Sequence, residues 1–415
     1  MPAAPAPHRH TSWRVLLSST FAFTICFAVW VIFAVLAIPI RQQLDLSETQ
    51  FGLLAAMPVL SGSLLRVPLG IWTDRYGGRP VFMALMLATV PPLWLLSYAT
   101  AYWQFLVLAL FIGVSGASFS VGTPYVARWF AREQQGLAMG VFGAGNSGSA
   151  ITKFVAPALI AAAGAWTIVP KVYAVALLVT AVVFWSLSAS DPAHLVSQRT
   201  SLRDQLALLR DKRVWRYCQY YSVVFGGYVA LALWMTKYYI GEYGFGIAAA
   251  ALLAASFSLP GGVLRALGGW IADRYGAFRT TWWVMWVCWV AFFILSYPQT
   301  HLSIQTTTGT QQFDLALGPV PFTLLLFTVG VAMAIGKASV FKFIADEFGQ
   351  NIGAVSGIVG LAGGLGGFLL PILFGVLLDL TGVRSSAFML LYGTVCVSLI
   401  FMHYSFRATA PRDTA

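Results

Sequence analysis

Twelve apolar stretches, each long enough to cross a lipid bilayer, constrain this 415-residue chain more than any other feature. A membrane-spanning helix needs about 20 mostly apolar residues. Only 9% of the residues are charged, whereas a soluble domain carries about 25% and needs them on its surface. We therefore predict an all-α membrane protein with twelve transmembrane helices, near residues 15–40, 50–72, 80–98, 102–129, 135–164, 168–189, 217–240, 246–271, 281–298, 319–345, 351–379 and 386–406.

The longest charged loop divides the predicted helices into two sets of six. It covers residues 191–216 and carries six basic side chains. We predict an N-terminal six-helix bundle over residues 1–190, a cytoplasmic linker loop over 191–216 and a C-terminal six-helix bundle over 217–415.

Basic residues are distributed unequally between the two sides of the predicted membrane. Of the 25 Lys and Arg, sixteen fall on the side of the termini, four on the other side (Arg41, Lys171, Lys237, Arg384) and five within spans. Positive charge collects in cytoplasmic loops of multi-pass proteins. We therefore expect both termini in the cytoplasm, with the protein in the cytoplasmic (inner) membrane. The net charge of +11 is explained by this bias, without a nucleic-acid partner.

An internal repeat relates the two halves. Residues 62–77 read GSLLRVPLGIWTDRYG and residues 261–276 read GGVLRALGGWIADRYG, so eight of sixteen positions match at an offset of 199. Arg66 and Arg265 are a matching pair within predicted spans. The same topology in each half indicates parallel repeats about an axis normal to the membrane.

Each of these arginines lies between two glycines at spacings of four, as in Gly62, Arg66 and Gly70. That spacing places the three residues on one helix face, and a face of small residues allows close helix contact. The arginines are thus expected to point into the protein and to face each other across a cavity. Their planar donor groups suit a planar anion such as nitrate. Binding to backbone carbonyls, or extension of the side chain to the membrane surface, is the alternative.

Acidic residues are missing from the predicted membrane interior. All fourteen Asp and Glu fall in loops or at span ends, while five cations fall within spans: Arg66, Lys153, Arg265, Lys337 and Lys342. Intramembrane charge is costly and marks functional sites. Because no carboxylate neutralises these cations, the balance predicts an anionic cargo.

The segment GIWTDRYGGR at residues 70–79 resembles the loop between helices two and three of the major facilitator superfamily, and GWIADRYG at 269–276 resembles its second copy. The resemblance implies the major facilitator fold, two pseudosymmetric six-helix bundles. We expect the charged residues of these loops to form interdomain salt bridges that act as a gate, with Arg128 as a partner. The gating candidates are Asp74, Arg75, Arg128, Asp273 and Arg274.

The segment QQGLAMGVFGAGNSGSAITKFVAP at residues 134–157 resembles the nitrate motif of the nitrate/nitrite porter family (NarK/NasA type), closest to its nitrate/proton symporter group. Its counterpart at 357–371 keeps the glycines and lacks the asparagine, so the two halves should bind an anion differently. The resemblance implies substrate-binding roles, with helix packing as the alternative, for Arg66, Arg265, Asn146, Phe119, Tyr221, Phe225, Gly143 and Gly145.

Lys153 lies seven residues after Asn146, two helical turns further along, near the same face. A buried lysine near two arginines is expected to lose its proton and to regain it when an anion binds. Lys153 is therefore a proton-coupling candidate, and Lys337 is a second one. Placement at a helix end is the alternative for Lys153, and we assign Lys342 to such an end.

Enzyme chemistry is not expected, because the five histidines form no metal or haem pair and no Walker motif is present. We predict no cofactor and no metal. The predicted function is nitrate import by alternating access, as a secondary active transporter coupled to protons. Nitrate/nitrite antiport, or exchange of small carboxylates of the oxalate/formate type, remains open. The expected partners are nitrate, nitrite, protons and the lipid bilayer, and we expect a monomer.

Overall fold

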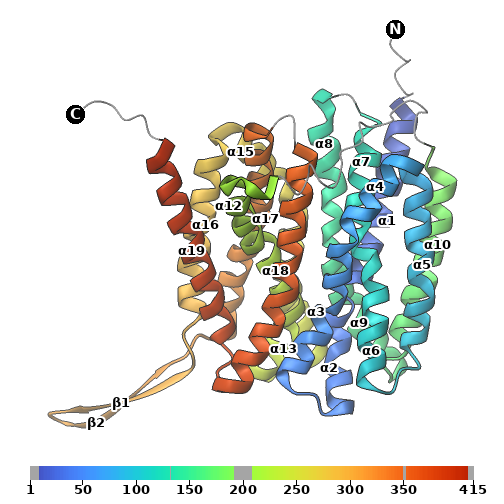
Figure 1. The fold of residues 1–415 in the computed structure, drawn as a ribbon. Helices are drawn as coiled ribbons and strands as arrows, with labels where there is room; N and C mark the ends of the chain where they lie inside the picture. Colours follow the sequence, from blue (N-terminus) through green and yellow to red (C-terminus); the bar gives the residue numbers. More distant parts are fainter. Residues whose placement is uncertain (1–8, 131, 191–207, 349–351, 410–415) are drawn as a thin grey trace, which may run out of the picture.

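The chain folds into two helical bundles that stand side by side, α1–α10 in one and α12–α19 in the other (Figure 1). The computed structural model describes residues 9–130, 132–190, 208–348 and 352–409. Most of the predicted linker, residues 191–216, lies outside this part of the chain. The helix after it begins at Lys212, earlier than the expected 217, because the side chain of Asp211 caps it by accepting from the Arg213 amide.

The N-terminal bundle contains ten α-helices and two 3-10 segments: α1 (Arg9–Trp30), α2 (Phe33–Leu44), α3 (Glu48–Leu64), α4 (Arg66–Tyr76), α5 (Gly78–Leu96), α6 (Tyr102–Ile112), η1 (Gly113–Ala117), α7 (Ser118–Ala127), α8 (Arg132–Gly143), η2 (Ala144–Ser147), α9 (Gly148–Ala163) and α10 (Ile168–Leu187). Several of these elements follow one another directly and form single bent or locally rewound spans.

The C-terminal bundle contains η3 (Leu208–Arg210), α12 (Lys212–Tyr221), the π-helical η4 (Ser222–Gly227), α13 (Tyr228–Tyr243), α14 (Ile247–Val263), α15 (Arg265–Tyr275), α16 (Ala277–Leu295), β1 (Thr300–Thr306), β2 (Gly309–Leu315), α17 (Pro319–Glu347), α18 (Ile352–Thr381) and α19 (Ser386–Thr409). In both bundles the Asp-Arg-Tyr-Gly turn joins the second half of a broken span to the next helix.

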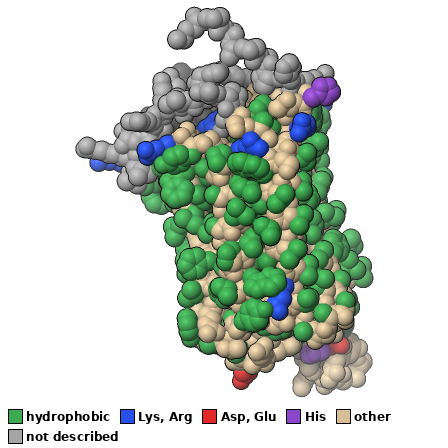
Figure 2. All heavy atoms as spheres, turned by 90° about the vertical axis from the view of Figure 1, so that its right-hand side faces the viewer, with side chains coloured by type: hydrophobic (Ala, Val, Ile, Leu, Met, Phe, Trp, Pro, Cys, Tyr) green, Lys and Arg blue, Asp and Glu red, His purple; other side chains and the backbone are tan. Residues whose placement is uncertain are grey.

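Ten helices of the described residues are long and apolar enough to span a membrane, and eleven if the bent pair α14–α15 counts as one span. The remaining predicted span, near 135–164, is the run α8–η2–α9. Apolar side chains cover the middle of the face shown in Figure 2, and Lys and Arg gather near the end that carries the termini. The multi-pass helical prediction is confirmed.

One element differs from the all-helical prediction. The loop between α16 and α17 is an antiparallel hairpin in which Thr300 pairs with Leu315 and Thr306 with Gly309. Apolar residues alternate with polar ones in both strands, and Gly309 supplies the positive φ of 125° at the turn. This local alternation, rather than a longer apolar run, produces the hairpin.

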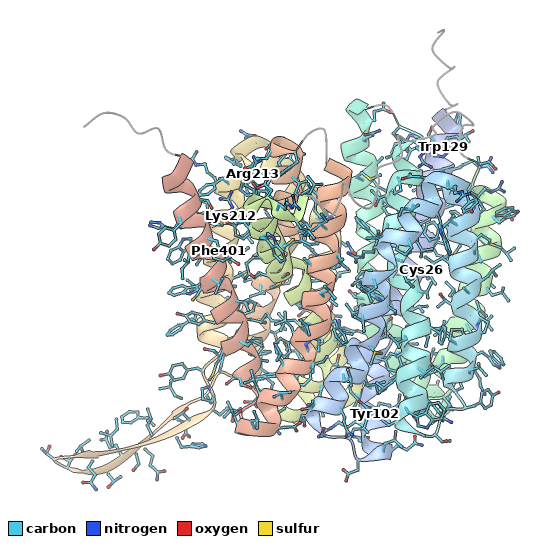
Figure 3. All side chains as sticks on the ribbon, viewed as in Figure 1. Cys26, Tyr102, Trp129, Lys212, Arg213 and Phe401 are labelled. Atoms are coloured by element: carbon cyan, nitrogen blue, oxygen red, sulfur yellow. The ribbon has the colours of Figure 1, made fainter. Side chains whose placement is uncertain are left out.

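The two bundles are joined firmly at the end away from the described chain ends, which we call the distal side. Figure 3 places Tyr102 at this side and Lys212 and Arg213 at the other. Here Glu48, at the start of α3, accepts from Arg41 at 2.7 Å and pairs with Lys237 of α13, in the other bundle. Lys237, which the sequence analysis assigns to the side away from the termini, lies in α13, and its side chain is only 11% exposed.

A second contact at the distal side also joins the bundles. Asp379, near the end of α18, accepts hydrogen bonds from the amides of Glu48 and Thr49 at 3.1 and 2.8 Å. It thereby caps the N-terminus of α3, where unpaired amides and the helix dipole favour negative charge. Trp234 packs between Phe51 and Phe374 just beneath. These contacts form a closed distal gate.

The distal gate predicts that Glu48→Gln opens this side. The amide that replaces the Glu48 carboxylate carries no charge, so Lys237 loses its ion-pair partner. A loss of about 1.4 kcal/mol in the stability of the closed state would shift the ratio of open to closed molecules tenfold. We expect a larger population of long distances between spin labels at Thr100→Cys and Leu380→Cys, both exposed distal positions. Glu242→Gln is the control, because Glu242 pairs with Arg384 within one bundle. Equal distance distributions in the two variants would contradict the gate.

Candidate functional site

A small pocket lies between the two bundles and draws its lining from both. It is lined by Phe23, Phe27, Arg66, Gly116, Phe119, Asn146, Tyr221, Phe225 and Arg265. Six of the eight residues predicted to bind substrate are in this set. The structure therefore brings together Arg66, Arg265, Asn146, Phe119, Tyr221 and Phe225, which come from five different helical runs.

Both arginines occupy the same place in the repeat, directly after a break in a spanning helix. Arg66 is the first residue of α4, after α3 ends at Leu64. Arg265 is the first residue of α15, and α14 and α15 meet at a bend of 49°. Breaks in membrane helices are tolerated where the backbone lines a cavity or is buried in protein. The two breaks place the two guanidinium groups at one pocket.

The other lining residues also come from irregular helix. Gly116 belongs to the 3-10 segment η1, Asn146 to the 3-10 segment η2 and Phe225 to the π-helical η4. Such segments inside longer helices recur at functional sites, because they redirect side chains without ending the helix. Their concentration around one pocket makes it the candidate functional site.

Arg66 reaches from the N-terminal bundle into the C-terminal one. Its Nη1 donates to the carbonyl of Gly360 in α18 at 2.9 Å, and its guanidinium carbon lies 5.1 Å from the centre of the Phe225 ring. Its Nε is buried and has no hydrogen-bond partner among the described residues. A buried charged donor without a partner is costly, so this atom is available to an acceptor in the pocket.

Arg265 makes the reverse contact. Its guanidinium carbon lies 5.1 Å from the centre of the Phe119 ring, in the other bundle, and 5.5 Å from that of Phe341. The ion pairs of the described residues include neither Arg265 nor Arg66. Two arginines without a carboxylate partner among the described residues therefore share one pocket. The absence of Asp and Glu from the predicted spans leads to the same expectation.

Aromatic rings flank the pocket from both bundles. Phe23 stacks on Phe142 with ring centres 4.8 Å apart, and Tyr221 stacks on Phe225 at 5.1 Å. Phe23 and Phe27 line the pocket but were not predicted. A repeat offset near 198 would align them with Tyr221 and Phe225, so the internal repeat held the signal that could have found them.

Gly143 and Gly145 lie behind the lining rather than in it. A Cβ on Gly143 would meet the Arg265 Cδ at 3.5 Å, and one on Gly145 would overlap the ring of Phe23. Gly145 therefore lets the Phe23 ring approach closely, which is the packing alternative, whereas a Cβ on Gly143 would make only an ordinary van der Waals contact. Asn146 is 2% exposed, and its side-chain amide donates to the Gly143 carbonyl at 2.9 Å.

The two proton-coupling candidates lie outside the pocket lining, in a buried polar network. Lys153 of α9 donates to the Ser258 hydroxyl of α14, across the two bundles. Lys337 donates to the Gly261 carbonyl at 2.5 Å, one turn before Arg265, and lies 3.5 Å from the centre of the Tyr228 ring. The Tyr228 hydroxyl donates to the Ser258 carbonyl at 2.8 Å and so links the two lysines. Neither lysine lies at a helix end.

Two ion pairs involve the gating candidates of the repeated loops. Asp74 pairs with Arg128, as expected for the partner, but both belong to the N-terminal bundle. Asp273 pairs with Lys342 at 3.5 Å within the C-terminal bundle. In this structure the bundles are joined at the distal side, and the expectation of interdomain salt bridges for these residues stays a prediction.

The two remaining gating candidates pack on neighbouring aromatic rings. The Arg75 guanidinium carbon lies 5.3 Å from the centre of the Tyr76 ring, and that of Arg274 lies 5.6 Å from the centre of the Trp270 ring. Lys342 also pairs with Asp346 at 2.8 Å in the C-terminal part of α17, five residues before the helix ends at Glu347.

Comparison with known proteins agrees with this architecture. The family model described as Major Facilitator Superfamily matches residues 19–317. The chain belongs to the major facilitator superfamily. It is 42% identical over 414 residues to the probable nitrate/nitrite antiporter NarK1 of Thermus thermophilus, covering 97% of this chain and 93% of the relative. It is also 30% identical to the nitrite extrusion protein of Bacillus subtilis, covering 91% and 90%.

These two relatives place the facilitator chain in the nitrate/nitrite porter family, a family of transporters rather than enzymes. Among solved structures, a bacterial homologue of the human lysosomal transporter Spinster, inward-facing and occupied, matches with a TM-score of 0.72. That match covers 96% of this chain and 97% of the other at 13% identity, so it supports the fold alone.

The facilitator fold also predicts unequal effects of two glycine substitutions in α18. Alanine favours helix over glycine by about 1 kcal/mol, so Gly357→Ala, whose Cβ meets nothing within 4 Å, should keep or raise the apparent Tm. A Cβ on Gly364 would overlap Ser63 of α3 in the other bundle, so Gly364→Ala should lower it. Fluorescence-detected unfolding in detergent measures both. A Tm for Gly364→Ala at or above that of Gly357→Ala would contradict this interface.

Proposed function

We propose that this facilitator imports nitrate across the cytoplasmic membrane by alternating access, with both termini in the cytoplasm and with uptake coupled to protons. The observation that carries the proposal is the pair Arg66 and Arg265 at one pocket without a carboxylate. A guanidinium stays charged at every working pH, and its planar donors match a planar oxyanion. Nitrate is such an anion and carries one negative charge.

The contacts of the arginines explain how an anion would join the bundles. Arg66 lies against Phe225 of the C-terminal bundle and Arg265 against Phe119 of the N-terminal bundle. Without an anion, the two positive charges repel each other in a medium of low dielectric constant. A nitrate between them provides oxygen acceptors for both, including the unpaired Nε of Arg66. Binding would therefore stabilise the state in which the bundles close around the pocket.

The aromatic rings would shape the same pocket. Their faces attract the guanidinium groups and hold them in position, while their bulk excludes water and strengthens electrostatic attraction to the anion. Asn146 places an amide at the N-terminal side of the pocket. The corresponding glycine-rich part of α18 provides a backbone carbonyl to Arg66 instead. The two halves would thus hold the anion differently.

Proton coupling is proposed for the lysine network. Lys153 and Lys337 both donate to neutral oxygen atoms and have no carboxylate partner among the described residues. A lysine in such surroundings is more easily deprotonated than one in water. Lys337 donates to the carbonyl of Gly261, which lies one helical turn before Arg265. An anion bound to Arg265 would therefore lie near Lys337 and favour the charged form of the lysine. Nitrate binding and proton uptake would then support each other.

Nitrate/nitrite exchange is the second candidate. The name of the Thermus thermophilus relative, a probable nitrate/nitrite antiporter, favours it. The pocket itself suits both modes, since arginines and aromatic rings line it and none of its lining residues is a carboxylate or a histidine. In exchange the lysines would be fixed charges, and nitrite would return through the same pocket.

The first test replaces each arginine by lysine. Lysine keeps the charge but loses the planar pair of donors, and the loss of one charge-assisted hydrogen bond costs about 1.5–3 kcal/mol, roughly 10- to 100-fold in affinity. We expect Arg66→Lys and Arg265→Lys to reduce nitrate uptake into proteoliposomes by at least about tenfold. Arg279→Lys, at an exposed position, is the control. Full uptake in both site variants would show that the donor geometry is not used, and competition by oxalate would favour small carboxylates instead.

A second test separates the two modes of transport. Wild-type nitrate uptake is measured with an inward proton gradient and, separately, with nitrite trapped inside the vesicles. We expect the proton gradient to drive accumulation, and Lys153→Gln to abolish that stimulation because the group that carries the proton is lost. Lys171→Gln, on the surface against Trp94 and Tyr98, should behave as wild type. Wild-type uptake that ignores the proton gradient and requires internal nitrite would favour exchange.

A further inference from the structure

The β1–β2 hairpin stands apart from the helical bundles. It leaves the distal end of the C-terminal bundle and extends outward beside it (Figure 1). All residues of the two strands are exposed except Thr300, which is half-buried. The hairpin is therefore not covered by the helices that it connects.

The strand register places all four large apolar side chains of the hairpin on one face, together with Thr300, Thr306 and Gln311. Residues directly opposite each other in an antiparallel pair share a face, and successive residues alternate. Leu302 faces Phe313, and Thr300 faces Leu315. One face thus carries four apolar side chains that are 43–48% exposed: Leu302, Ile304, Phe313 and Leu315. The opposite face carries polar residues, among them His301 and Asp314, which pair at 2.6 Å.

This apolar face requires a cover, because an isolated two-stranded sheet is only marginally stable in water. The surface next to it indicates which cover. The α16 end that leads into the hairpin exposes Phe293 and Ile294, and the α17 start that follows it exposes Val320 and Leu324. Both helices are long and apolar enough to span a membrane. Their exposed apolar side chains are therefore expected to face lipid. The hairpin continues this lipid-facing surface at the level of the distal helix ends.

We propose that the hairpin lies on the bilayer surface at the distal side, with Leu302, Ile304, Phe313 and Leu315 in the boundary between headgroups and acyl chains. Amphipathic elements bind at this depth when apolar burial is sufficient. Residues 298–318 contain neither Lys nor Arg, so binding depends on apolar burial rather than on attraction to anionic headgroups. The hairpin fixes the α16–α17 end of the C-terminal bundle to the membrane surface, independently of which anion the pocket binds.

The experiment compares the two faces of the hairpin in the full-length protein. Single cysteines are introduced as Leu302→Cys or Phe313→Cys on the apolar face, and as Ser303→Cys or Gln312→Cys on the polar face. Each is labelled with an environment-sensitive fluorophore and reconstituted into phosphatidylcholine vesicles that contain brominated lipid. Labelling of the native cysteines is measured as background in the wild type. Three of these cysteines are buried and one is half-buried.

We expect labels at 302 and 313 to be quenched at least about threefold more strongly than labels at 303 and 312, with emission shifted to the blue, as burial at the headgroup boundary requires. The same difference is expected when phosphatidylglycerol is added or the salt concentration is raised, because charge is not the cause. Equal quenching on the two faces, or water-like emission at all four positions, would overturn the proposal. Cross-linking of Phe313→Cys between two chains, without lipid quenching, would also overturn it, because a second copy would then be the cover.

Discussion

The central physical constraint is a pair of positive charges held in a membrane interior without negative charge to balance them. Arg66 has one backbone carbonyl and one aromatic face as partners, and Arg265 has two aromatic faces. These neutral groups replace only part of the water that a guanidinium loses. An anion in the pocket would offset the remaining cost, and a neutral cargo would leave it in place. The expected preference for an anion thus follows from the two uncompensated positive charges and does not depend on the shape of the pocket.

The backbone irregularities follow from placing these charges at one point. A straight helix carries a side chain on its surface, whereas a break at Arg66 or Arg265 starts a new helix segment at the charged residue itself. The segments η1, η2 and η4 adjust the neighbouring helices at the same level. The pseudosymmetry is incomplete at the fifth span of each half. The N-terminal copy is broken and places Asn146 in the pocket lining, whereas α18 runs unbroken from Ile352 to Thr381 and provides a glycine carbonyl.

The parts that the sequence predicts are those that repeat or that carry charge. Arg66 and Arg265 could be located because a matching charged residue within two apolar spans has few explanations. Phe23 and Phe27 escaped notice because the apolar residues of α1 show no helical periodicity that separates lining from packing. The hairpin was missed because its strands alternate over only seven residues each. The hydrogen bond from the α3 N-terminus to Asp379 joins residues 330 positions apart. It can form only in a conformation in which the two bundles meet at the distal side. Such a contact leaves no local signal.

The charged residues at the distal gate and those at the pocket differ in whether they have partners of opposite charge. At the distal gate, Glu48 neutralises Arg41 and Lys237, and Asp379 satisfies two backbone amides, so this gate is stable without a substrate. At the pocket, Arg66 and Arg265 have no carboxylate partner among the described residues. The same two helices serve both places: α3 begins at Glu48 and ends just before Arg66, while α18 carries both Gly360 and Asp379. A change in the Arg66 contact with α18 therefore acts on the helix pair that also closes the gate. Occupancy of the pocket can bias the gate through this pair, without a separate signal between them.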